Sequence, residues 1–246
     1  MDRELKYETA TDRYEFTKDV CLGAGAQGIV LQGRNKKNHE EIVAVKRIKH
    51  RVVFEGHKTC LDNINKFKIP KEEFNLIQKL NHPNIIRYLD YGSSNSANIN
   101  KEYIVMEYME NKSLSSYMDN NELMFRDESK LERAIEQILF GVKYLHDHNI
   151  VHRDIKPGNI LVSKDLTLKI SGSKLVDIDR SVSTHVGTTL FYSPDRHLKS
   201  TKETDLWSVG ITILCMCVHA TYRLKIESTI NTLLPNYDRS KKRDLY

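Results

Sequence analysis

Eight consecutive residues near the middle of the chain hold an unusual set of chemically active side chains. The segment His152-Arg153-Asp154-Ile155-Lys156-Pro157-Gly158-Asn159 places an acid, two cations and an amide between a predicted helix and a predicted strand. A carboxylate can accept a proton, and cationic and amide groups can hold negative charge or oxygen atoms. A loop of random composition seldom contains such a set, so this segment is the first candidate for a catalytic site.

A glycine-rich segment near the N-terminus is a candidate phosphate-binding loop. Gly23, Ala24, Gly25 and Gly28 lie between two predicted strands, and Val30 follows in the second. Glycines let the backbone bend tightly and approach a phosphate with no side chain in the way. A dinucleotide-binding fold would need a helix after this segment, so the strand that follows it disfavours that fold.

Lys46 and Glu73 form a second candidate pair. Lys46 ends the apolar run Val43-Ala44-Val45-Lys46, and Glu73 lies on the next predicted helix. Lys46 is either a functional cation or a surface lysine whose stem lies along the sheet. Glu73 is either the ion-pair partner of Lys46 or an ordinary surface acid.

A β-rich first part must position the glycine-rich segment and Lys46. The residue pattern predicts strands at 16–22, 28–33, 41–48, 85–91 and 102–108. A helix is predicted at 70–80, where Phe74, Ile77 and Leu80 recur at helical spacing.

A helical second part must position the Asp154 segment. Helices are predicted at 113–119, 129–148 and 204–219, and short strands at 159–163 and 167–171. In the second helix the apolar face is predicted to comprise Ala134, Ile138, Leu139, Val142 and Leu145. The order of elements indicates an α+β protein with an N-terminal extension at 1–15, one lobe at 16–109 and another at 110–246.

Over residues 16–220 these segments, in this order, resemble the eukaryotic protein-kinase family of the Ser/Thr type. The resemblance implies a bilobal fold with a small antiparallel β lobe, which carries one helix, and a mainly helical large lobe. It implies that the glycine-rich segment covers the phosphates of ATP. Lys46 would contact the α- and β-phosphates and pair with Glu73.

The same resemblance assigns roles to the remaining candidates. Asp154 would be the base that orients the substrate hydroxyl, Lys156 marks the Ser/Thr type, and Asn159 would bind a metal ion. Met106 would be the gatekeeper, followed by hinge residues Glu107 and Met109. The adenine would lie among the apolar side chains of Val30, Ala44 and Leu161.

The chain departs from the family pattern where Asp-Phe-Gly is expected. Counted from Asn159 without a gap, that motif falls on Gly172-Ser173-Lys174. The family's aspartate holds the Mg²⁺ that bridges the β- and γ-phosphates, so Mg²⁺ or Mn²⁺ binding should be weakened or lost. Asp177 and Asp179 are either replacements brought in by a shifted loop or exposed charges.

Length and composition limit the classes of binding partner and the cellular compartments that are expected for the chain. The chain has 246 residues and a net charge of +5, with basic and acidic residues interspersed, so no nucleic-acid partner is expected.

No apolar run approaches the ~20 residues of a membrane span. The four cysteines suggest no disulfide framework, so a cytoplasmic or nuclear location is expected. The resemblance implies later helices that are not recognised before Tyr246, so a large lobe truncated after the helix at 204–219 is expected. The sequence gives no oligomeric state.

Two functions remain open from the sequence. The chain could be an ATP-dependent Ser/Thr protein kinase of impaired efficiency that acts on a protein substrate. Alternatively it could be a pseudokinase, a nucleotide-binding scaffold that regulates a protein partner without chemistry. The intact Asp154 segment favours the first function, and Gly172 favours the second.

Overall fold

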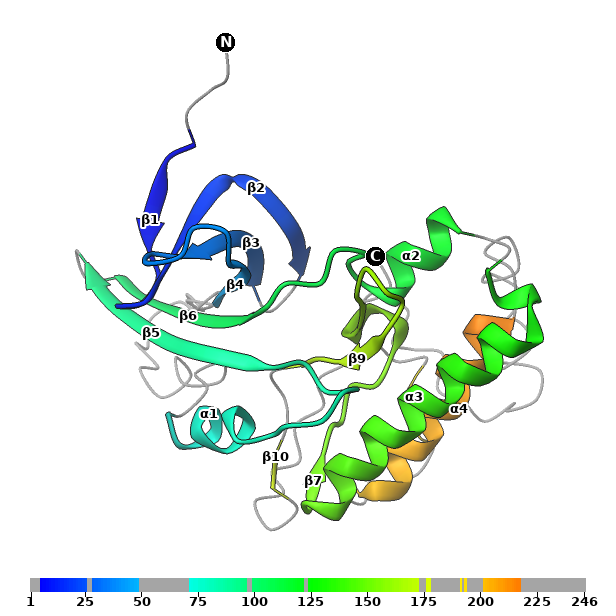
Figure 1. Cartoon of the computed structure of the whole chain (residues 1–246). Coiled ribbons are helices and arrows are strands. Elements are labelled where there is room, and N and C mark those ends of the chain that lie inside the picture. Colours follow the sequence, from blue (N-terminus) through cyan, green and yellow to red (C-terminus); the bar gives the residue numbers. More distant parts are fainter. Residues whose placement is uncertain are drawn as a thin grey trace, which may run out of the picture. The chain divides into compact units, whose positions relative to one another are not determined.

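The computed structural model describes residues 5–25, 28–48, 71–96, 99–121, 124–172, 176–177, 191, 193 and 201–217 (Figure 1). Contacts divide the chain into two units. The first comprises Met1–Asn81 and Arg87–Met109, and the second comprises His82–Ile86 and Glu110–Tyr246. Within the described ranges no helix has the length and apolar character to cross a membrane.

The first unit is built on a six-stranded antiparallel sheet in the order β1-β2-β3-β4-β6-β5. Its strands are β1 (Tyr7–Thr9), β2 (Tyr14–Gly25), β3 (Gly28–Asn35), β4 (Ile42–Ile48), β5 (Tyr88–Ser96) and β6 (Ile99–Glu107). The five strands expected from the sequence are confirmed. Strand β1 is additional, because three residues are too few to show a periodic pattern.

Alternation along these strands separates a buried face from a second face of the sheet. The buried cluster consists of Ala10, Tyr14, Phe16, Leu31, Val43, Val45, Tyr103 and Val105. Successive side chains of a strand point to opposite faces. Val30, Ala44 and Lys46, which alternate with cluster residues, therefore belong to the other face.

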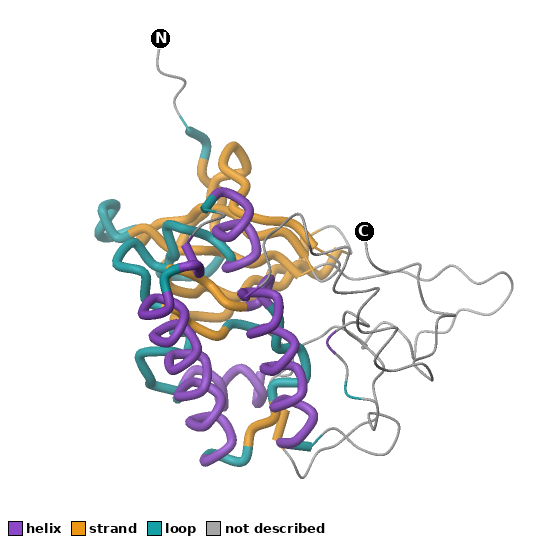
Figure 2. The backbone as a smooth tube through the Cα atoms, turned by 90° about the vertical axis from the view of Figure 1, so that its right-hand side faces the viewer, coloured by secondary structure: helices purple, strands orange, loops and turns teal. Residues whose placement is uncertain are grey.

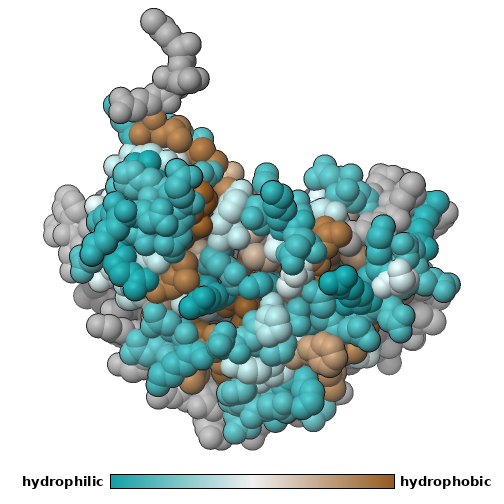
Figure 3. Space-filling model, viewed as in Figure 1, coloured by the Kyte–Doolittle hydropathy of each residue, from teal (hydrophilic) through white to brown (hydrophobic). Residues whose placement is uncertain are grey.

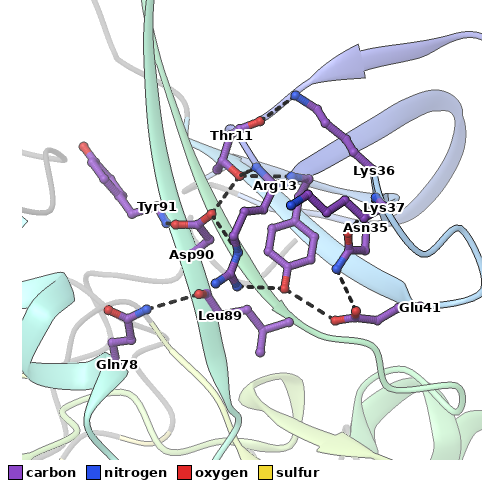
Figure 4. Close-up of polar contacts among 11 residues, drawn as sticks. Thr11, Arg13, Asn35, Lys36, Lys37, Glu41, Gln78, Leu89, Asp90 and Tyr91 are labelled. Atoms are coloured by element: carbon purple, nitrogen blue, oxygen red, sulfur yellow. Dashed lines mark hydrogen bonds and ion pairs between the residues drawn. The ribbon is translucent and has the colours of Figure 1, made fainter.

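The sheet curls, so that the turn after β1 meets β5 although the two strands lie at opposite ends of the strand order (Figure 4). The Thr11 hydroxyl donates to Asp90 Oδ2 at 2.8 Å, and Lys36 Nζ donates to the Thr11 carbonyl oxygen at 2.8 Å. A Cβ atom on Gly92 would lie 2.2 Å from the Ala10 carbonyl oxygen. Only a glycine fits at this crossing of the two segments.

One helix, α1 (Lys71–Gln78), packs on β5 within this unit. Phe74, Ile77 and Leu80 are buried, as the sequence predicts. The Phe74 ring lies 5.5 Å from that of Tyr91, and Gln78 Nε2 donates to the Leu89 carbonyl oxygen at 3.1 Å. The apolar face of α1 is thereby fixed against the strand.

The second unit contains the remaining elements. Its helices are α2 (Leu114–Asn120), α3 (Glu128–Asp147) and α4 (Lys202–Cys217), with short 3₁₀ helices η2 (Met124–Arg126) and η3 (Pro157–Asn159). Two-stranded sheets pair β8 (Ile160–Val162) with β9 (Leu168–Ile170), and β7 (Ile150–Val151) with β10 (Val176–Asp177). The long helices α3 and α4 lie side by side (Figures 1 and 2).

Helix α3 begins at a strong cap and buries most of its predicted face. Asp127 Oδ1 accepts hydrogen bonds from the backbone N–H groups of Ser129 at 3.1 Å and Lys130 at 3.4 Å. Four of the five predicted core residues are buried, namely Ala134, Ile138, Val142 and Leu145. The prediction for Leu139 was wrong: it is 42% exposed, because it lies about 100° around the helix from Ile138.

Exposed apolar residues are few among the described residues. Besides Leu139 the exposed large apolar side chains are those of Leu5, Phe140, Leu206 and Leu214. Figure 3 agrees for the face that it shows, where hydrophilic residues cover most of the described surface.

Candidate functional site

The Asp154 segment lies between β7 and β8 in the second unit, where a proline starts a short turn of helix. Pro157 occupies the first position of η3, a place that suits its fixed φ and missing N–H. The Asn159 N–H then donates to the Lys156 carbonyl oxygen at 2.9 Å. This turn brings the side chains on either side of it back toward one another.

The three residues predicted to carry chemistry in this segment meet at one carboxylate. Asn159 Nδ2 donates to Asp154 Oδ2 at 2.8 Å and to the Asp154 carbonyl oxygen at 2.7 Å. Lys156 Nζ lies 3.3 Å from Asp154 Oδ1. A carboxylate is an acceptor of hydrogen bonds and of protons, and an amide and a cation beside it fix its orientation. The arrangement can orient a hydroxyl and place a cation beside it.

A buried acid from a distant helix holds the backbone of this segment. Asp205, on α4, is fully buried. Its Oδ2 accepts from the His152 N–H at 2.8 Å, and its Oδ1 accepts from the Arg153 N–H at 2.8 Å. His146 Nε2 lies 2.9 Å from the same Oδ2. Charge-assisted bonds of this kind compensate for burying the carboxylate.

Asp205 also holds a strained residue. Arg153 has a φ of 66°, in the left-handed region that residues other than glycine seldom adopt. Such a conformation persists where surrounding bonds enforce it. Asp205 was not among the site residues expected from the sequence. The signal that could have found it is an acid inside an apolar helix, which must have partners if it is buried.

His152 packs against the position where the family's metal-binding aspartate was expected. Its Nδ1 accepts from the Asp154 N–H at 3.3 Å, so Nε2 carries the proton and donates to the Ser171 carbonyl oxygen at 3.1 Å. A Cβ atom on Gly172 would lie 2.9 Å from His152 Nε2. Ser173 and Lys174 lie outside the described residues.

The resemblance implies Mg²⁺ ions held by an aspartate and an asparagine. The described residues at these two positions supply the asparagine and not the aspartate. The amide nitrogen of Asn159 is engaged by Asp154, so its Oδ1 is the atom that could bind a cation. Gly172 offers no side chain as a second ligand. Asp177 lies in β10, where its backbone pairs with Ile150, and Asp179 lies outside the described residues. Among the described residues no group of three or more His, Cys, Asp or Glu side chains could hold a metal ion.

The glycine-rich segment forms the end of the β2–β3 hairpin in the first unit. Gly25 ends β2 and pairs with Gly28, which begins β3, while Ala24 pairs with Ile29 and Gly23 with Val30. A Cβ atom on Gly28 would lie 2.2 Å from the Arg47 carbonyl oxygen, so a larger residue is excluded there. Gly23 has open space around it.

Four predicted nucleotide-binding residues share the sheet face opposite the core cluster. Val30 is the cross-strand partner of Lys46, and Ala44 is the partner of Met106. Partners in an antiparallel pair point to the same face. These four side chains therefore combine three apolar groups with one cation, as a purine ring and its phosphates require.

The other predicted residues are placed as follows. Glu107 ends β6, where its backbone N–H donates to the Arg87 carbonyl oxygen at 3.0 Å and its Oε1 accepts from the Arg87 N–H at 2.7 Å. Met109 follows at the end of the first unit and is buried. Leu161 lies in β8 of the second unit. Glu73 lies in α1, and its side chain is outside the described part of the chain.

Comparison with known proteins identifies the family. A model of the protein kinase domain matches residues 16–237. Cell division control protein 7 of Schizosaccharomyces pombe is 33% identical over 203 residues, which is 81% of this chain and 18% of that protein. MAP3K epsilon protein kinase 1 of Arabidopsis thaliana is 32% identical over 229 residues, 89% of this chain and 16% of that protein.

A bacterial relative is similar as well. The probable serine/threonine-protein kinase PknB of Lactococcus lactis is 30% identical over 209 residues, 82% of this chain and 31% of that protein. The chain thus spans less than a third of the length of each of these three relatives. Members of the matched family use ATP and Mg²⁺ and act on protein substrates. The chain belongs to the protein kinase family.

Proposed function

We propose that this chain binds ATP and transfers its γ-phosphoryl group to Ser or Thr hydroxyls of a protein substrate, at a rate impaired by the missing metal ligand. The observation that carries the proposal is the contact of Asn159 and Lys156 with the two carboxylate oxygens of Asp154, at 2.8 and 3.3 Å. The Ser/Thr preference rests on Lys156 and on the serine/threonine kinase PknB among the relatives.

Asp154 acts on the substrate hydroxyl. Its carboxylate, fixed by Asn159, accepts the hydroxyl hydrogen bond and takes the proton as the oxygen attacks the γ-phosphorus. A bond forms between that oxygen and phosphorus, the bond from phosphorus to the β–γ bridging oxygen breaks, and ADP leaves. Lys156, beside Asp154, offsets negative charge on the transferred group.

The nucleotide is held by the face of the first unit that carries Val30, Ala44, Lys46 and Met106. The apolar members pack on the adenine and Lys46 binds phosphate oxygens, with backbone groups of Glu107 and Met109 at the adenine edge. Asn159 Oδ1 is the side-chain oxygen that would hold a Mg²⁺ ion, and such an ion would supply positive charge against the phosphates.

A second function, that of a pseudokinase, is favoured by one observation. Counted from Asn159 without a gap, Gly172 falls where the family has its metal-binding aspartate, and it lies against His152. Losing an electrostatic group that acts on the transition state typically lowers the rate by about 10²–10³-fold. If the loss in rate is at the high end of this range, the chain would bind nucleotide and regulate a protein partner through its fold.

Transfer of labelled γ-phosphate separates these two functions. The assay measures label on the chain itself and on a basic Ser/Thr peptide, with Mg²⁺ and with Mn²⁺. The control is Asp154→Asn, which keeps the shape of the side chain and removes its negative charge. Slow labelling that the Asp154→Asn variant abolishes is the expected result. Folded, nucleotide-binding protein that transfers no label would establish the pseudokinase instead.

A further inference from the structure

The residues that precede the matched kinase domain are packed into the first unit. The match to the family begins at residue 16, whereas β1 and the turn after it occupy 7–13, here called the N-terminal segment. The guanidinium carbon of Arg34 lies 3.6 Å from the centroid of the Tyr7 ring, which is a cation–π contact. Thr11, in the turn, is buried. The N-terminal segment is therefore a built part of the sheet.

One hydrogen bond joins the N-terminal segment to β5. The Thr11 hydroxyl donates to Asp90 Oδ2 at 2.8 Å (Figure 4). The other carboxylate oxygen, Asp90 Oδ1, accepts the Tyr91 N–H at 3.0 Å. Arg13 Nε lies 3.8 Å from Asp90 Oδ2, but its side chain is exposed, so this ion pair contributes little. The carboxylate thus fixes the backbone of β5 relative to Thr11.

The two neighbours of Asp90 in β5 both hold α1. The Leu89 carbonyl oxygen accepts from Gln78 Nε2 at 3.1 Å, and the Tyr91 ring lies 5.5 Å from the Phe74 ring. The register of β5 on β6 shifts immediately before Asp90. An irregularity of this kind redirects the groups beside it. Helix α1 is therefore attached to β5 on both sides of the residue that the N-terminal segment holds.

Helix α1 packs on the sheet face that carries Lys46. Tyr91 is the cross-strand partner of Ile104, and Ile104 is the partner of Lys46. Partners in an antiparallel pair point to the same face, so the ring that contacts Phe74 belongs to the face of Lys46. The same helix carries Glu73, the expected ion-pair partner of Lys46. A displacement of α1 on Tyr91 would therefore move Glu73 relative to the lysine.

We propose that Thr11 and Asp90 are positioning residues, whose hydrogen bond fixes α1 and, through α1, the pairing of Glu73 with Lys46. The N-terminal segment then sets the affinity for ATP, although it lies outside the matched family domain. Loss of the bond loosens α1 and weakens ATP binding. The effect on ATP rests on the proposed function, whereas the effect on α1 does not.

Substitutions at Thr11 separate its hydroxyl from its shape. Thr11→Val keeps the branched shape and removes the hydroxyl, and Thr11→Ser keeps the hydroxyl. If Thr11→Val does not fold, Asp90→Asn takes its place: one oxygen remains for the Tyr91 N–H, and the amide nitrogen cannot accept from Thr11. Gly33→Ala is the control for a general loss of stability in the same unit. An added Cβ atom there would lie 2.6 Å from the Glu15 carbonyl oxygen.

The first measurement is amide hydrogen exchange without ligand, followed by mass spectrometry. Over α1, Thr11→Val should exchange at least about fivefold faster than wild type, because α1 opens locally once the bond is lost. Thr11→Ser should match wild type. Gly33→Ala should speed exchange in the strands around it and leave α1 near the wild-type rate. An α1 that exchanges no faster in Thr11→Val than in Gly33→Ala would overturn the inference.

The second measurement is the Kd for ATP by isothermal titration calorimetry, which a general loss of stability does not change while the protein is folded. Thr11→Val should raise the Kd at least about threefold in the wild-type background and should not raise it further when Glu73→Gln is present, because both changes act on one contact. Gly33→Ala should leave the Kd unchanged.

An equal effect of Thr11→Val in both backgrounds would show that the bond does not act through Glu73, and would overturn the inference. If wild type does not bind ATP, the proposed function fails, and the exchange rates still decide whether Thr11 holds α1.

Discussion

The carboxylate of Asp205 on α4 accepts the backbone N–H of His152 at 2.8 Å, and the two residues are 53 positions apart in the chain. The same carboxylate holds the Arg153 N–H at 2.8 Å. Both bonds fix the peptide groups that lead into Asp154. The geometry of the candidate catalytic residues therefore depends on a helix that follows them in the sequence.

Replacing Asp205 by alanine should destabilise the protein and disorder the Asp154 segment. The change leaves two buried N–H donors without this acceptor, and each such group typically costs about 1–3 kcal/mol. Urea unfolding of the Asp205→Ala variant and of wild type measures the loss in the free energy of unfolding. Glu136→Ala, which removes an exposed acid from α3, is the control and should have little effect. Equal stability of the Asp205 and Glu136 variants would contradict this role for Asp205.

Gly141→Ala in α3 should be destabilising although alanine favours helices. An added Cβ atom would lie 2.8 Å from the Asn84 carbonyl oxygen and 2.8 Å from Ile170 Cδ1. Forcing a methyl group into such a contact costs about 1–3 kcal/mol, which outweighs a gain in helix propensity of about 1 kcal/mol. Chemical denaturation should show Gly141→Ala below wild type and Gly210→Ala, where an added Cβ atom has nothing within 4 Å, at or above it. A stabilised Gly141→Ala variant would show that the contact is not formed.

Thr11→Val should loosen the contact between β5 and the turn that joins β1 to β2. The Thr11 hydroxyl donates to Asp90 and accepts from the N–H groups of Arg13 and Tyr14, each at 3.2 Å. Valine has nearly the same shape but no hydroxyl, so the expected loss is about 1–3 kcal/mol in urea unfolding. Thr9→Val on exposed β1 is the matched control and should be nearly neutral. Two neutral substitutions would mean that the turn does not depend on this hydroxyl.

The stability of the second unit should fall in acid because of His82. Burial lowers the pKa of His82 below its ordinary value of 6.5. Its Nδ1 accepts the Asn84 N–H at 3.0 Å, and its ring stacks on Tyr144 at 4.8 Å. The unfolded chain therefore takes up the proton more readily, so this contribution is present above pH 6.5 and is lost as the pH falls through the folded-state pKa.

Unfolding from pH 7.5 to 5.5 of wild type and His82→Asn measures this contribution. Other histidines titrate in both proteins, so the difference between the two isolates His82. The stability advantage of wild type should shrink as the pH falls. A difference that is constant with pH, or that grows in acid, would contradict the assignment.

The strands and helices were largely predictable because hydrophobic periodicity records which face is buried. Phe74, Ile77 and Leu80 on α1 show this, as does the alternation of Val43 and Val45 with Ala44 and Lys46 along β4. Strands β1, β7 and β10 were not foreseen, because two or three residues carry no readable period.

The site was predictable only where its residues are close in sequence. Asp154, Lys156 and Asn159 lie within six residues, and a single turn brings them together. The hydrogen bond from the His152 N–H to Asp205 and the contact of His152 with Gly172 depend on how segments that are distant in sequence pack together. A missing ligand at Gly172 was therefore expected from the sequence, whereas its contact with His152 depends on the fold.

Thermal stabilisation by ATP, with and without Mg²⁺, directly measures nucleotide binding and its dependence on the metal. ATP at about 100 times its Kd should add about 2.7 kcal/mol to the free energy of unfolding. Because Gly172 offers no ligand, this stabilisation should be nearly the same in excess Mg²⁺ and in excess chelator. Stabilisation that appears only with Mg²⁺ would mean that an intact metal site survives, and no stabilisation under either condition would contradict nucleotide binding itself.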